Sequence, residues 1–348
     1  MIYKEKILEI NKPWSKHFDR YFSVSTIGFF DIESTGLSAA RNFMILGGIL
    51  LWDGKSFTLK QYLAEDKKEE SKLLVSYFKE LLKCDILVSY NGINFDQIFI
   101  NKRFEQNLIP AKLGYTDEYG ITFHNFFHLD LFALVRSCTN FNKFLPDLKQ
   151  KTVEKYLNID ENRDDLISGA ESVTLYDRYM SSRDESILNQ ILLHNSDDCI
   201  QLAYLTKLFG KTDIHRIAFL KGFPVFDNGT GLFIKSLKFR GNQLIVSGSH
   251  KGVKISYKCY EMYYRFELST GENEFKLIIE LDNLKDGYRI LDLKKFPVDI
   301  NKFKDMPNCK FDYLLLSKDD TINYRECNFF SKAMLLFLIK ESRCSDEN

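Results

Sequence analysis

Two carboxylates, Asp31 and Glu33, directly follow apolar residues in the stretch FFDIESTGLS. Side chains two residues apart in a β-strand point to the same face, so both acids are aimed at one place. Like charges held together need a positive partner, and a divalent cation is one. A strand that simply ends in two solvated acids is the alternative interpretation of this stretch alone.

Two further stretches carry acids beside predicted helices. In YNGINFDQIF, a strand ends at Tyr90, a glycine turn follows, and Asp96 begins a helix, where a carboxylate can also act as a cap. In LLHNSDDCIQLAYLTKLF, His194 and Asp198 are four residues apart and share one helical face. A buried helix with a satisfied histidine would also explain that pair.

Helical phase distinguishes Asp198 from its neighbour Asp197. The side of the helix that holds Asp198 is otherwise apolar and should face the core; its members are Ile191, His194, Asp198, Leu202 and Leu205. Asp197 falls on a face that we predict to be wetter, with Gln190, Gln201 and Tyr204. An inward carboxylate needs a partner because burying an unpaired charge is costly, so we expect Asp198 to be the functional acid.

The elements that must position these acids alternate up to about residue 210. The pattern predicts strands over 25–33, 43–54, 56–64, 85–90 and 126–132, helices over 67–83, 94–107, 145–159 and 184–209, and a loop around Gly169. The chain beyond is rich in β-branched and aromatic residues with Gly and Asn turns, which predicts antiparallel hairpins and a closing helix over 329–340. We therefore expect two domains, 1–210 and 211–348.

Charge is divided between these two parts. Residues 1–210 hold 25 Lys and Arg against 29 Asp and Glu, a net −4, and residues 211–348 hold 23 against 19, a net +4. Residues 228–260 contain six basic residues, no acid and four aromatic residues. This composition predicts a surface for nucleic-acid phosphates that includes Lys251, Lys254 and Lys258; the solvated face of an ordinary hairpin is the alternative.

Composition sets the broad class. The chain has 348 residues, of which 45% are hydrophobic and 28% charged, as in soluble globular proteins. Its longest apolar run, 43–52, is too short to span a bilayer, and charges at Lys4, Glu5, Lys6 and Glu9 interrupt any apolar leader. The seven cysteines form no CxxC pair. We expect reduced thiols in a cytoplasmic protein, without a membrane partner, a disulfide framework or a zinc site.

The order of elements, a three-strand meander followed by helix, strand, helix and strand, resembles the RNase H-like fold. In that α/β layout a mixed five-stranded sheet is flanked by helices, and here a mostly antiparallel β domain would follow it. Asp31 and Glu33 on the first strand would approach Asp96, and the last long helix would deliver Asp198. Four oxygen ligands of this kind suit Mg²⁺ or Mn²⁺.

Three motifs carry a closer resemblance. DIESTG resembles the D-x-E-T motif of the DEDD 3′–5′ exonucleases, and NGINFD and HNSDD resemble their second and third motifs. The YprB-like branch, a group of predicted bacterial exonucleases with an RNase H-like domain, has the same H-N-x-x-D motif and an HLDL strand like the one at 128–131. The resemblance covers roughly residues 24–210.

The resemblance implies a role for each matching residue. Asp31, Glu33, Asp96 and Asp198 would bind two Mg²⁺ or Mn²⁺ ions about 4 Å apart, and His194 would take a proton from the attacking water. Ser34 and Thr35 would line the path of the terminal nucleotide, and Asn91 would shape the second motif. Asp130 would either support the site or only hold a strand end. Two departures are that His194 stands four residues before the last acid, where the DEDDh branch has five, and that Ser34 replaces the usual Thr.

These features together predict a metal-dependent nuclease. A 3′–5′ exonuclease would hydrolyse the phosphodiester bonds of DNA or RNA with a single-stranded end, and the basic second domain would hold the polynucleotide. The alternative is a nucleic-acid-binding or scaffold protein on the same fold that has lost catalysis. The complete set of four acids and His194 favours the nuclease.

Overall fold

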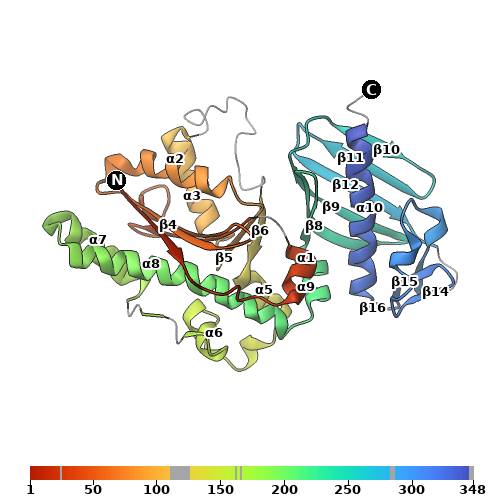
Figure 1. The fold of residues 1–348 in the computed structure, drawn as a ribbon, viewed down its shortest axis with the longest axis horizontal. Helices are drawn as coiled ribbons and strands as arrows, with labels where there is room; N and C mark the ends of the chain where they lie inside the picture. The colour runs from red at the N-terminus through yellow and green to blue at the C-terminus, as the bar shows by residue number, and fades with distance from the viewer. Residues whose placement is uncertain (24–25, 110–125, 161–162, 165–166, 283–286, 345–348) are drawn as a thin grey trace. The chain divides into compact units, whose positions relative to one another are not determined.

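The computed structural model describes residues 1–23, 26–109, 126–160, 163–164, 167–282 and 287–344. The chain divides into two compact units, Met1–Thr212 and Asp213–Asn348; Figure 1 labels many of their helices and strands. Among the described residues, no helix combines the length and the apolar character that crossing a bilayer requires.

A mixed sheet of six strands forms the centre of the first unit. Its spatial order is β1-β4-β3-β2-β5-β6. β2, β3 and β4 form the antiparallel meander, while β5 and β6 run parallel to β2. The strands span Ile2–Leu8 (β1), Ile27–Ser34 (β2), Met44–Trp52 (β3), Phe57–Leu63 (β4), Ile86–Ser89 (β5) and Phe127–Asp130 (β6).

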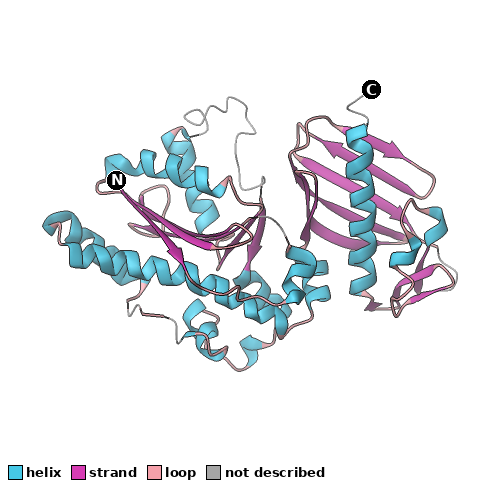
Figure 2. Ribbon diagram, viewed as in Figure 1, coloured by secondary structure: helices cyan, strands magenta, loops and turns pink. Residues whose placement is uncertain are grey.

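Helices cover both faces of this sheet, as Figures 1 and 2 show. On one face, α2 (Glu70–Leu81) and α3 (Asp96–Asn107) pack on β2 and β3 around buried Phe30 and Ile32. On the other face lie α7 (Gly169–Ser182) and α8 (Glu185–Leu205), whose apolar residues pack on β3 and β4. Among the described residues of this unit, the remaining helical segments are α1 (Lys16–Phe22), η1 (Lys67–Glu69), α5 (Leu131–Cys138), η3 (Phe141–Lys143), α6 (Gln150–Tyr156) and η5 (Thr206–Gly210).

The sheet has one strand more than the five that we predicted. The additional strand, β1, pairs with β4 at the edge of the sheet and is mostly exposed. Lys4, Glu5 and Lys6 lie within it, and charged residues are common on edge strands because they discourage pairing with other chains. The same charges hide the alternation by which a strand is recognised from sequence.

A second correction concerns the region around Gly169, which we predicted to be a loop. Gly169 is instead the first residue of α7. The hydroxyl of Ser168 accepts a hydrogen bond from the backbone N–H of Glu171, and the Glu171 carboxylate accepts one from the backbone N–H of Ser168. This reciprocal cap satisfies donors that a helix start otherwise leaves free, and it outweighs the low helix propensity of glycine.

The second unit is built on a six-stranded antiparallel sheet of order β10-β11-β12-β9-β8-β7, which confirms the predicted antiparallel domain. Alternate residues of β11 and β12 are buried, and α10 lies across one face of the sheet (Figure 2). A smaller sheet combines β13, β14, β15 and β16. The strands of this unit span Phe223–Asp227 (β7), Thr230–Arg240 (β8), Gln243–Lys251 (β9), Tyr257–Tyr260 (β10), Tyr264–Ser269 (β11), Glu274–Glu280 (β12), Tyr288–Asp292 (β13), Cys309–Lys310 (β14), Tyr313–Lys318 (β15) and Thr321–Ile322 (β16). Its helical segments span Ile214–Lys221 (α9), Leu293–Lys295 (η6), Ile300–Lys302 (η7) and Tyr324–Cys344 (α10).

Candidate active site

Asp31 and Glu33 lie on β2, an interior strand of the sheet that pairs with β3 on one side and β5 on the other. Phe30 and Ile32 point into the core beneath α2 and α3. Because side chains alternate along a strand, Asp31 and Glu33 point to the opposite face, which α8 covers. A strand buried on both faces thereby delivers two carboxylates to one side of the sheet.

Asp96 reaches the same strand from the neighbouring connection. β5 runs parallel to β2, so the loop that leaves its C-terminal end lies at the edge where β2 also ends. This loop leads to Asp96, the buried first residue of α3. Its Oδ1 accepts a hydrogen bond of 3.3 Å from the backbone N–H of Ile32. Asp96 therefore lies beside the residue that separates Asp31 from Glu33.

α8 supplies the remaining two candidates, His194 and Asp198, and it covers the face of the sheet to which Asp31 and Glu33 point. The Nε2 atom of His194 lies 3.5 Å from Glu33 Oε1 and 3.5 Å from Asp198 Oδ2. One possible ligand atom from each of these three residues lies within 4.8 Å of the others. The i, i+4 spacing in the sequence therefore becomes a convergent group once the helix packs on β2.

A cleft of about 690 Å³ opens above these groups. Asp31, Glu33, His194 and Asp198 line it, whereas Asp96 is 5% exposed and does not. The remaining wall combines apolar side chains with two lysines; among its residues are Leu37, Phe95, Val173, Lys149 and Lys151. The cleft thus offers acids at its base and both apolar and cationic surface around them.

Burial, together with neighbouring negative charge, raises the pKa of three acids of this site. Burial raises the pKa of Asp31 well above its usual range, and the charges of Asp198, Asp96 and Glu33 add to the effect. Burial also raises the pKa of Glu33 to about 7, opposed by the nearby His194, and that of Asp96 to about 7. Positive charge placed among these groups would favour their ionised forms. Oxygen donors in this number fit a hard divalent cation such as Mg²⁺ or Mn²⁺.

The predicted difference in burial between Asp197 and Asp198 is wrong. Asp197 is 4% exposed, and its Oδ2 accepts a 2.8 Å hydrogen bond from the backbone N–H of Asp164. Gln201, predicted to share its wetter face, is also buried. α8 contacts β2, β3 and α7, and the segment at Asp164 adds a further covered side, so amphipathic phase could not rank the two acids by burial. Asp198 is nevertheless the acid beside His194.

Arg163 is a residue of the site that the sequence did not indicate. Its Nη2 donates a 2.6 Å hydrogen bond to Asp198 Oδ1, and its Nε and Nη2 each lie 3.0 Å from an oxygen of buried Glu154. A permanent cation thus lies beside one of the candidate ligands. It is 35 residues away from Asp198 along the chain, so no local spacing could connect them.

The loop of the second motif is held by Asp130. Asp130 accepts hydrogen bonds from the backbone N–H groups of Asn91, at 2.9 Å, and Ile93, at 3.1 Å, and it also caps α5. Asn91 has a φ of 65°, a left-handed conformation that asparagine tolerates. Of the two expected roles of Asp130, the contacts correspond to holding the strand end and its loop. Asn91 forms the turn that leads to Asp96 and does not line the cleft.

Ser34 and Thr35 both line the cleft. The Ser34 hydroxyl donates to the carbonyl oxygen of Gly36 at 2.9 Å, and the Thr35 hydroxyl accepts from the backbone N–H of Phe43 at 3.0 Å. These bonds fix the turn at the end of β2. The two residues therefore shape the wall beside Glu33 in addition to presenting hydroxyls.

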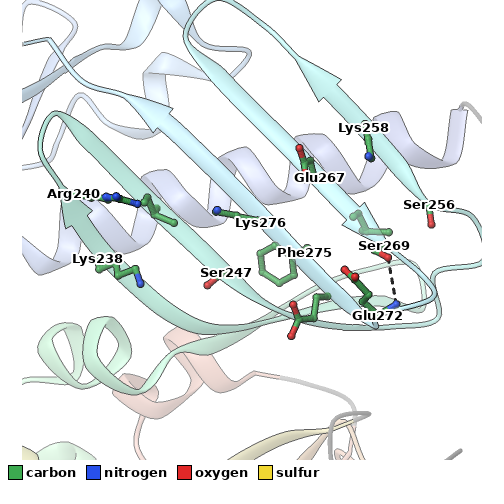
Figure 3. Close-up of a pocket in the computed structure, with 13 residues that line it drawn as sticks. Lys238, Arg240, Ser247, Ser256, Lys258, Glu267, Ser269, Glu272, Phe275 and Lys276 are labelled. Carbon is green, nitrogen blue, oxygen red and sulfur yellow. Dashed lines mark hydrogen bonds between the residues drawn. The ribbon is translucent and has the colours of Figure 1, made fainter. Parts of the chain in front are cut away.

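Of the three lysines of the second unit that were predicted to bind nucleic acid, one lines a groove on the sheet. Lys258 lines a groove of about 760 Å³ on the open face of the sheet, as Figure 3 shows, whereas Lys251 and Lys254 are not among the groove's residues. The other basic residues of the groove are Lys238, Arg240 and Lys276, and its acids are Glu267, Glu272 and Glu274. Residues 228–260 contain no acid in sequence, yet acids lie beside them in the groove, because β11, β12 and the turn between these strands contribute them.

A family comparison agrees with this architecture. Residues 28–209 match a family model described as the RNase_H superfamily. No curated protein matches the chain significantly. Solved structures similar to it include a family B DNA polymerase from the hyperthermophilic archaeon Pyrobaculum calidifontis (18% identity, TM-score 0.38, covering 52% of this chain and 24% of that one). Another is a product-bound exonuclease I (13% identity, TM-score 0.32, covering 64% of this chain and 58% of that one).

Proposed function

The chain belongs to the RNase_H superfamily, and from that premise we propose that it is a metal-dependent nuclease that hydrolyses phosphodiester bonds of DNA or RNA. The observation that carries the proposal is that Asp31, Glu33, His194 and Asp198 line one cleft, with Asp96 buried beside the strand that carries the first two. These residues come from three separate segments of the chain. Buried acids that raise one another's pKa are costly to the fold, and such clusters are typical of functional sites.

In the proposed reaction, Asp31, Glu33, Asp96 and Asp198 would hold two divalent cations. Mg²⁺ or Mn²⁺ would supply positive charge for the attacking and leaving oxygens of the phosphodiester. His194 Nε2, between Glu33 and Asp198, accepts the proton of the attacking water; an imidazole suits this role because its ordinary pKa is near neutral. Lys149 and Lys151 would offset phosphate charge, and Leu37, 86% exposed beside the cleft, offers apolar surface to a base.

The finer assignment is that of a DEDD-type 3′–5′ exonuclease of the YprB-like branch, supported by the three motifs in their order. The second unit would hold the polynucleotide near a single-stranded end. The proposal is tested with a 5′-labelled oligonucleotide and Mn²⁺, on matched single- and double-stranded DNA and RNA. A ladder that shortens from full length is expected. Internal fragments in the first turnovers would indicate an endonuclease, and early release of the labelled nucleotide would contradict the 3′–5′ polarity. Binding without any hydrolysis would favour a non-catalytic nucleic-acid-binding protein.

A first prediction compares the adjacent acids of α8. Asp198→Asn is expected to lower kcat by at least about a hundredfold, because several kcal/mol of charge stabilisation are lost with a ligand. Asp197→Asn should change kcat by less than about threefold, since an asparagine oxygen can still accept the hydrogen bond from Asp164. Steady-state rates and melting temperatures of both variants decide the matter. Equal losses, or the reverse order, would show that Asp198 is not a ligand.

A second prediction concerns residues 228–260 of the second unit, the window that contains six basic residues and no acid. Neutralising Lys251, Lys254 and Lys258 together should weaken oligonucleotide binding with little effect on the rate at saturating substrate. The salt dependence of binding should flatten by up to about 0.7 for each phosphate that the variant no longer neutralises. The matched control removes the exposed Lys302, Lys304 and Lys310 of the same unit. If both triple variants bind like wild type, or both bind equally weakly, the window is not the binding surface.

A further inference from the structure

Three residues stand side by side across the sheet, directly beneath α8. In the register of the strands, Asp31 of β2 is opposite Gly48 of β3, and Gly48 is opposite Gln61 of β4. Paired residues of neighbouring strands point to the same face, so Asp31 and Gln61 flank a position that has no side chain. Asn195 of α8 fills that position, and it is fully buried.

Hydrogen bonds link this group in one direction, with Gln61 donating to Asn195 and Asn195 donating to Asp31. Gln61 Nε2 donates to the carbonyl oxygen of Leu192 at 2.8 Å and to Asn195 Oδ1 at 3.0 Å. Asn195 Nδ2 donates to Asp31 Oδ2 at 3.2 Å. A backbone carbonyl can only accept, so the amide nitrogen of Gln61 must face Leu192. Asn195 must then turn its oxygen to Gln61, which leaves its NH₂ group for Asp31.

Gly48 provides the space for this arrangement. A Cβ atom at position 48 would lie 2.0 Å from Asn195 Oδ1 and 2.7 Å from its Cγ. No side chain can occupy that space while Asn195 remains in place. The glycine therefore allows the close approach of α8 that brings the amide to the carboxylate, and any larger residue would push Asn195 away from Asp31.

We propose that Asn195 is a positioning residue, oriented by Gln61 over Gly48, that fixes the rotation of the Asp31 carboxylate for a divalent cation. The amide engages Oδ2 of Asp31, so Oδ1 is the oxygen that it leaves for a cation in the cleft, which Asp31 lines. The inference rests on the proposed function, because it assigns a role toward a cation that Asp31 would bind. Groups that orient metal ligands in this way commonly change metal affinity 10–100-fold when they are removed.

The test measures Mn²⁺ affinity of the full chain by calorimetry, together with kcat, KM and the melting temperature without metal. Asn195→Ala and Gly48→Ala are each expected to weaken Mn²⁺ binding by about 10–100-fold, with kcat reduced more than KM is raised. Gln61→Met should have a smaller effect of the same kind. That effect should vanish in the Asn195→Ala background, because Gln61 acts through Asn195. Gln201→Met, at a buried position six residues further along α8, is the control and should bind Mn²⁺ like wild type.

The outcomes separate this inference from the proposed function. If wild type binds no Mn²⁺ and hydrolyses no oligonucleotide, both are overturned. If wild type binds Mn²⁺ and the folded Asn195→Ala protein binds it equally well, the positioning role alone is overturned and the nuclease proposal stands. Additive effects of Gln61→Met and Asn195→Ala on Mn²⁺ affinity would also contradict the inference that Gln61 acts through Asn195. Should Gly48→Ala fail to fold, the pair of Asn195 and Gln61 variants carries the test.

Discussion

Replacement of Asp31 by alanine is expected to abolish hydrolysis, with a fall in kcat of at least about a thousandfold, while the protein stays folded. Asp31 lines the cleft and is electrostatically linked to Glu33, Asp96 and Asp198. Removing it relieves repulsion among buried acids, so the melting temperature without metal should stay level or rise. Loss of Asp31 takes an acceptor from the neutral amide of Asn195, whereas loss of Asp198 would take a partner from the permanent cation of Arg163.

Single-turnover rates with Mn²⁺ and thermal unfolding in chelator check this expectation on the same preparation. Asp177→Ala, which removes an exposed carboxylate from α7, is the matched control and should retain wild-type activity. A folded Asp31→Ala protein that keeps more than about a tenth of the wild-type rate would contradict the four-acid assignment.

Removal of divalent cations is expected to abolish activity and to make stability strongly dependent on pH. Folding raises the pKa of Glu33 from 4.5 to about 7 and that of Asp96 from 3.8 to about 7, because burial disfavours their charged forms. An acid whose pKa is raised by folding stabilises the folded state fully below its ordinary pKa, and this contribution is lost as the pH rises through the folded value. Between about pH 4 and pH 7, the metal-free protein should therefore lose stability from these two groups.

Mn²⁺ should oppose this loss, since a cation favours the ionised carboxylates. Its stabilising effect should grow from about pH 5 to pH 8, and binding below neutral pH should release protons, which calorimetry in buffers of different ionisation enthalpy detects. The double variant Glu33→Gln, Asp96→Asn supplies the reference for all other titrating groups. If its melting temperature without metal falls with pH as steeply as that of wild type, the two acids do not titrate as described.

The architecture of the site was largely predictable from local patterns. The alternation in FFDIESTGLS placed Asp31 and Glu33 on one face of a strand, and the i, i+4 spacing placed His194 and Asp198 on one face of a helix. Such periodicities are properties of a single segment and need no knowledge of its neighbours. The predicted meander and the following parallel strands are present in the sheet, with β1 added at an edge where charges mask the strand pattern.

Sequence alone therefore determined which side chains of each segment share a face, and with them the α/β class and the acids that could do chemistry. Only the tertiary structure decided how those faces meet. It buried Asp197 together with its neighbours, placed Arg163 beside Asp198, and set Asn195 over Gly48 between Gln61 and Asp31. These interactions join residues from 33 to 164 positions apart. Spacing within a segment carries no information about such interactions, because they depend on strand register and on how closely a helix approaches a sheet.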